Sequence, residues 1–71
     1  MDNEEKLEFI ENILGLPMYC LKEEMELSDV ETWNMDTMID FQNELIDMGK
    51  DISIDELQEC ERVVELLRFL D

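Results

Sequence analysis

Apolar side chains recur at intervals of three and four residues in three stretches of this chain, and that spacing is typical of amphipathic helices. The first stretch begins at Asp2 or Asn3, either of which can accept hydrogen bonds from free backbone N–H groups and so cap a helix. It ends at Gly15, because Gly readily takes the left-handed conformation of a helix C-terminus and the following Pro17 prevents continuation. We therefore predict a first helix that ends at Gly15.

The second stretch predicts a helix over residues 35–48. Asn34 is a suitable N-cap, and Gly49 marks the end of this helix. Trp33 and Met38 occupy the two positions of a hydrophobic staple around the N-cap, so we expect Trp33 to be substantially buried. The apolar stripe of this helix comprises Met38, Ile39, Phe41, Leu45 and Met48.

The third stretch opens with the clearest local motif in the chain. Ser53 and Glu56 have the spacing of a capping box, which predicts a helix that begins at Ile54. Apolar residues continue to the C-terminus, but their spacing does not decide whether residues 54–70 form one helix or two. The three stretches together predict an all-α bundle in a single domain over residues 1–71.

The connection between the first two helices, residues 16–33, shows no clean period. A connection of this length in a small domain either packs through its own side chains or carries a function. We expect it to be ordered against the ends of the helices, with a turn around Lys22–Met25. The apolar residues available to hold it in place are Met18, Tyr19, Leu21, Met25, Leu27, Val30 and Trp33.

Charge limits the partners of this chain. Twenty-one Asp and Glu residues against five Lys and Arg residues give a formal net charge of −16. Such a surface repels nucleic acids and anionic membranes, so we expect contact with neither, whereas it attracts basic protein surfaces. Because 45% of the residues are hydrophobic and are placed periodically, the chain is expected to fold despite this charge.

The sequence offers few groups for chemistry. The N-terminal residues are acidic and no apolar stretch is long enough for a signal peptide or a membrane span, so we expect a cytoplasmic protein with Cys20 and Cys60 reduced. There is no His, and two Cys alone do not make a zinc site. An apparent calcium loop at Asp51 has Glu56 where such loops need Gly. We predict no catalytic residue, metal site or cofactor. We therefore expect that the protein is not an enzyme.

Five segments in the right order resemble the acyl carrier protein family, which includes the peptidyl and D-alanyl carriers. They are residues 6–16, Leu27–Trp33, Met38–Leu45, Met48–Ser53 and Val63–Leu66. The resemblance covers nearly the whole chain and implies a bundle of three long helices and one short helix, with a long ordered first loop. Arg62 stands where the family has a capping Thr, which leaves open a fusion of the last two helices.

The resemblance breaks where the family carries its phosphopantetheine arm, on the Ser of a Trp-Asp-Ser-Leu motif. The corresponding residues here are Trp33, Asn34, Met35 and Asp36. Met35 has no hydroxyl to esterify, so no arm and no other cofactor are expected. A shifted alignment would put Thr37 at the attachment position, but the unshifted one keeps an apolar set on the core positions of the helix. That set is Ile39, Phe41 and Leu45.

Acyl carrier proteins meet basic patches on their enzymes through the second helix, and the resemblance implies the same use here. The carboxylates on one side of this helix are Asp36, Asp40, Glu44 and Asp47. Met35 would add an adaptable apolar contact. From the residues alone, an ordinary solvated face is an equally good interpretation.

The resulting hypothesis is a non-catalytic, monomeric interaction module without an arm, which docks through its acidic second helix on a basic surface of a partner enzyme. Two alternatives stay open. One is a genuine acyl, aminoacyl or peptidyl carrier modified at Thr37. The other is an acidic nucleic-acid mimic that inhibits a nucleic-acid-binding protein.

Overall fold

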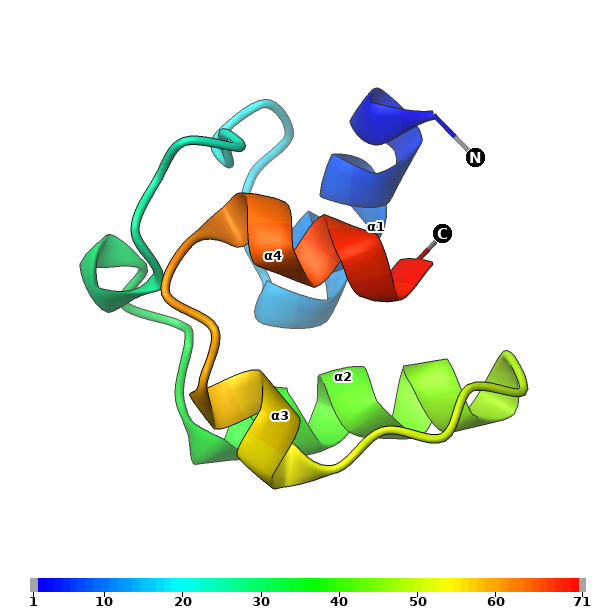
Figure 1. The fold of residues 1–71 in the computed structure, drawn as a ribbon. Coiled ribbons are helices and arrows are strands. Elements are labelled where there is room, and N and C mark those ends of the chain that lie inside the picture. The colour runs from blue at the N-terminus through cyan, green and yellow to red at the C-terminus, as the bar shows by residue number, and fades with distance from the viewer. Residues whose placement is uncertain (1, 71) are drawn as a thin grey trace.

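The computed structural model describes residues 2–70, which form four α-helices and two short 3-10 helices (Figure 1). The elements are α1 (Asn3–Leu14), η1 (Leu27–Asp29), α2 (Met35–Asp47), α3 (Ile54–Gln58), α4 (Val63–Leu67) and η2 (Arg68–Leu70), which continues α4. Over this described part of the chain, extended backbone pairs only in an isolated bridge between Glu26 and Arg62. The prediction of an all-α fold is confirmed.

Helix α1 packs against both α2 and α4, and α3 packs against α2. Figure 1 shows α1 and α4 on one side of the molecule and α2 with α3 on the other, while the first loop runs around one end. The apolar core enclosed by these elements comprises Ile10, Leu14, Leu21, Leu27, Val30, Phe41, Leu45, Ile52, Leu57, Val63, Leu66, Leu67 and Leu70. Helices and loop therefore contribute to one continuous core.

The caps predicted from local sequence are in place. Asp2 caps α1, Asn34 caps α2 and Ser53 caps α3, each accepting a hydrogen bond from the backbone N–H three residues later. Gly15 follows α1 with a φ of 70°, in the left-handed region. A side-chain N-cap stabilises a helix by ~1 kcal/mol, so the three N-cap residues fix where α1, α2 and α3 begin.

The prediction of three long helices is not confirmed, because the C-terminal segment forms only short helices. Helices α1 and α2 have 12 and 13 residues, whereas α3 and α4 have five each and η2 adds three. The question left open for residues 54–70 is also answered. Two separate helices form, and residues 59–62 lie between them.

Backbone groups of the first loop explain where α4 begins. The first two N–H groups of α4 belong to Val63 and Val64 and have no acceptor within their own helix. They donate instead to the carbonyl oxygens of Met25, at 3.0 Å, and Glu23, at 3.1 Å. The loop thus supplies the acceptors that a capping side chain would otherwise provide.

The side chain of Glu65 completes this helix start. Its carboxylate accepts hydrogen bonds from the backbone N–H groups of Arg62, at 2.8 Å, and of Glu61. These bonds favour the charged form and lower the pKa of Glu65 below its usual value. The carbonyl oxygen of Glu61 also accepts a hydrogen bond from the N–H of Leu27 at 2.8 Å. This bond holds the chain extended before α4.

The first loop packs against the core through its own side chains. Its buried side chains are Leu21, Leu27 and Val30. The expected turn closes through a hydrogen bond from the Met25 N–H to the Lys22 carbonyl oxygen. A buried carboxylate of α1, Glu11, accepts the N–H of Leu21 at 2.8 Å and so ties the loop to the first helix.

Candidate functional site: the outer face of helix α2 and the Trp33 pocket

Helix α2 buries only a narrow stripe, centred on Phe41 and Leu45, with Met38 half-buried beside it. Ile39 and Met48 are each 42% exposed, so the prediction that they join the apolar stripe of the core is wrong. Two residues span about 200° around a helix, so Ile39 and Phe41 cannot face the same core. Met48 lies beyond the last helical residue, as the C-cap.

The four carboxylates predicted to bind a partner are all exposed, as is Met35. They are Asp36, Asp40, Glu44 and Asp47, and their spacing places them along one side of α2. Residues 35–47 include no Lys or Arg, so no cation within the helix compensates this charge. Asp47 in the last turn also opposes the helix dipole, which makes a cation from outside the helix favourable there.

An exposed apolar stripe runs beside these carboxylates, and only its first member, Met35, was expected from the sequence as a partner contact. Met35, Ile39 and Ile46 are 47%, 42% and 51% exposed. Each of them immediately precedes an Asp of the acidic side, so the two stripes lie about 100° apart around the helix. We call these two stripes together the outer face of α2. It consists of the four carboxylates named above and the three apolar residues.

The acidic side of the outer face borders a groove between α1 and α2. This groove has a volume of about 550 Å³. Helix α1 contributes the apolar side chains Phe9 and Ile13, and α2 contributes the carboxylates Asp40 and Glu44. Negative charge on α2 is therefore flanked by apolar surface on two sides.

The two candidate attachment positions differ in their surroundings. Met35 is exposed at the start of α2. The hydroxyl of Thr37 is occupied, because it donates to the Thr32 carbonyl oxygen and accepts the backbone N–H of Asn34 at 3.0 Å. Asn34 in turn accepts the N–H of Thr37, so both side chains form the N-terminal cap of α2.

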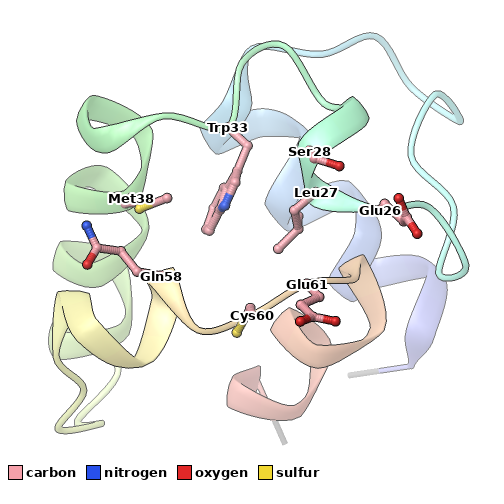
Figure 2. A pocket seen from close by; sticks show the side chains of 8 residues that line it. All are labelled: Glu26, Leu27, Ser28, Trp33, Met38, Gln58, Cys60 and Glu61. Carbon is pink, nitrogen blue, oxygen red and sulfur yellow. The ribbon is translucent and has the colours of Figure 1, made fainter.

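A second feature, the Trp33 pocket, opens between η1, the start of α2 and the segment after α3 (Figure 2). It has a volume of about 400 Å³ and is lined by Glu26, Leu27, Ser28, Trp33, Met38, Gln58, Cys60 and Glu61. Trp33 is half-buried rather than enclosed in the core. Its ring makes an edge contact with Phe41 at 6.3 Å between centroids and 77° between planes, and it also lines the pocket. Sequence reasoning found the Trp33–Met38 pair but not the hollow beside it.

Cys60 lines this pocket, and neither it nor Cys20 is in a disulfide. Burial and the nearby carboxylates of Glu65, Glu59 and Glu56 raise the pKa of the Cys60 thiol to about 11. The thiol is therefore protonated at neutral pH and donates to the Glu56 carbonyl oxygen. A raised thiol pKa lowers the fraction of thiolate, which is the nucleophilic form.

Comparison of the chain with protein-family models, curated proteins and solved structures finds no match. The resemblance to acyl carrier proteins therefore stays a prediction. Over residues 2–70, no helix combines the length and apolar character needed to cross a membrane. The described residues also include no group of three or more acidic or sulfur side chains placed to hold a metal ion.

Proposed function

We propose that this protein is a non-catalytic interaction module that docks through the outer face of α2 on a basic surface of a partner enzyme. In this proposal it resembles an acyl carrier protein that lacks the phosphopantetheine arm. The interaction would be its function, and no residue of the chain would perform chemistry.

The observation that carries this proposal is the pair of parallel stripes on α2. Exposed carboxylates at Asp36, Asp40 and Asp47 run beside three apolar residues that are 42–51% exposed. Exposed apolar residues beside charged ones are a common composition of a docking surface, because apolar contact supplies affinity and charge supplies orientation. An ordinary solvated face would carry the carboxylates without the apolar strip.

The carrier alternative needs a free hydroxyl near the start of α2. Thr37 offers one, but its hydrogen bonds to Thr32 and Asn34 would have to break before an arm could be attached. That cost favours the interaction module over the carrier.

Docking can be tested with a photo-crosslinking side chain at position 39, which identifies the partner, followed by titration of the purified partner. We expect the variant D36N/D40N/D47N to bind roughly 3- to 150-fold more weakly at low salt, from three surface pairs of ~0.2–1 kcal/mol each. The loss should shrink as salt is added, because salt screens surface charges.

The matched control removes three exposed carboxylates from outside α2, at Glu24, Glu31 and Asp51. If this control variant weakens binding as much as the α2 variant, general charge attraction and not the outer face carries the interaction. A partner that binds nucleic acid through the same basic surface would favour the mimic alternative instead.

The carrier alternative predicts that the wild-type chain gains the mass of a phosphopantetheine arm. The interaction module predicts no gain. We expect intact mass spectrometry to show no addition to the wild-type chain after incubation with a phosphopantetheinyl transferase and coenzyme A. The variant N34D/M35S/D36L rebuilds the family motif and serves as the positive comparison. An added arm mapped to Thr37 of the wild type would overturn the proposal.

A further inference from the structure

Two pairs of side chains line the groove between α1 and α2 from its two sides. Phe9 and Ile13 stand four residues apart on α1, and Asp40 and Glu44 stand four residues apart on α2. Residues at this spacing are neighbours on one helix face, with Cβ atoms about 5–6 Å apart. The groove therefore has an apolar pair on the α1 side and an acidic pair on the α2 side.

The acidic pair has no cation beside it in the groove. The other lining residues are Asn12 and Asn43, so none of the described residues that line the groove is basic. Lys6 of α1 is buried and does not line it. No hydrogen bond between described residues uses the carboxylate of Asp40 or Glu44. Like charges four residues apart on a helix repel each other, so a cation between these carboxylates is favourable.

The apolar pair is accessible from solvent. Phe9 and Ile13 are half-buried, whereas Ile10 and Leu14, on the adjacent face of the same helix, are buried in the core. An occupant with both an apolar part and a positive charge is therefore complementary to the two sides of the groove. An anion would meet two carboxylates, and a purely apolar occupant would leave them without a partner.

We propose that the groove between α1 and α2 binds a lysine side chain from the basic surface of the partner. The aliphatic stem of the lysine packs on Phe9 and Ile13, and its ammonium group lies between the carboxylates of Asp40 and Glu44. Lysine suits this arrangement because its stem is apolar, while its compact ammonium has three donors that two carboxylates can share. The volume of about 550 Å³ leaves room for the partner backbone on either side of the lysine.

This inference rests on the proposed docking function for the source of the lysine alone. It adds a distinction among the carboxylates of the outer face. Asp40 and Glu44 have apolar surface of α1 beside them, whereas Asp36 and Asp47 do not line the groove. The first two are therefore expected to hold the lysine, and the other two to act only through long-range attraction.

The test titrates the isotope-labelled full chain with the peptide acetyl-Ala-Lys-Ala-amide at low salt and about pH 6, and follows its nuclear magnetic resonance spectrum. We expect saturable shifts of backbone amides in residues 9–13 and 40–44. A peptide with norleucine in place of Lys keeps the stem without the charge, and should bind at least about fivefold more weakly. A peptide with 2,4-diaminobutyrate keeps the charge on a shorter stem, and should bind about threefold more weakly.

Matched pairs of substitutions separate the groove from general charge attraction. We expect D40N/E44Q to weaken the lysine peptide at least about fivefold, and D36N/D47N, which removes the same charge from the same side of α2, to weaken it less than about twofold. The inference is overturned by the absence of a saturable shift, by equal binding of the norleucine peptide, or by equal weakening from both pairs. Because the peptide offers only one lysine, these outcomes leave docking of the whole partner to its own titration.

Discussion

Replacing Phe41 with Ala is expected to lower the free energy of unfolding by about 3–5 kcal/mol, whereas Ile39→Ala should change it by roughly 0.5 kcal/mol or less. Phe41 is fully buried between the helices and contacts the ring of Trp33, so its removal leaves a cavity in the centre of a small core. Ile39 lies on the outer face and is 42% exposed, so shortening it leaves no cavity. For a domain of this size, the Phe41 loss is a large fraction of total stability.

Urea unfolding followed by far-UV circular dichroism measures both values under the same conditions. Ile39→Ala is the matched control, because both residues lie in the same helix and only one faces the core. Equal losses would mean that α2 is rotated so that Ile39 is buried. That result would restore the placement of Ile39 on the core stripe and remove the apolar strip on which the docking proposal depends.

The second large effect is expected at the buried carboxylate of α1. Glu11 is 2% exposed and accepts the N–H of Leu21 at 2.8 Å. Glu11→Ala removes this acceptor and leaves a buried N–H without a partner, which costs about 1–3 kcal/mol. Glu11→Gln keeps an acceptor oxygen at the same side-chain length, so it should retain most of that stability.

Urea unfolding gives the stability of both variants, and amide hydrogen exchange at Leu21 reports the bond itself. Exchange at Leu21 should accelerate in Glu11→Ala much more than in Glu11→Gln. Equal losses in the two variants would show that the negative charge of Glu11, and not its acceptor oxygen, holds the loop.

The sequence predicted features that depend on neighbours along the chain. Asp2, Asn34 and Ser53 each cap a helix three residues from the N–H that they accept, so short-range spacing was sufficient to place α1, α2 and the start of α3. The exposed carboxylates of α2 were also placed correctly, since helical periodicity alone puts them on one side.

The features that were left open or missed depend on contacts between distant segments. The break before α4 depends on carbonyl groups of Glu23 and Met25, which no local pattern around Arg62 reveals. The burial of Phe41 rather than Ile39 depends on where α1 meets α2, because apolar residues lie on both sides of the helix. The apolar–acidic pairs Met35-Asp36, Ile39-Asp40 and Ile46-Asp47 were nevertheless visible in the sequence, and they were the available signal for the outer face.

The hydrogen bonds from Val63 and Val64 to the first loop make that loop a template for the start of a helix near the other end of the chain. By its irregular sequence, the segment around residues 23–25 looks like a site that would accept an insertion or a cut. Its carbonyl oxygens are instead held in place by the hydrogen bonds that they accept from the first two N–H groups of α4. The two segments therefore form or unfold together. A cut or insertion in this part of the longest loop would also disrupt the start of α4.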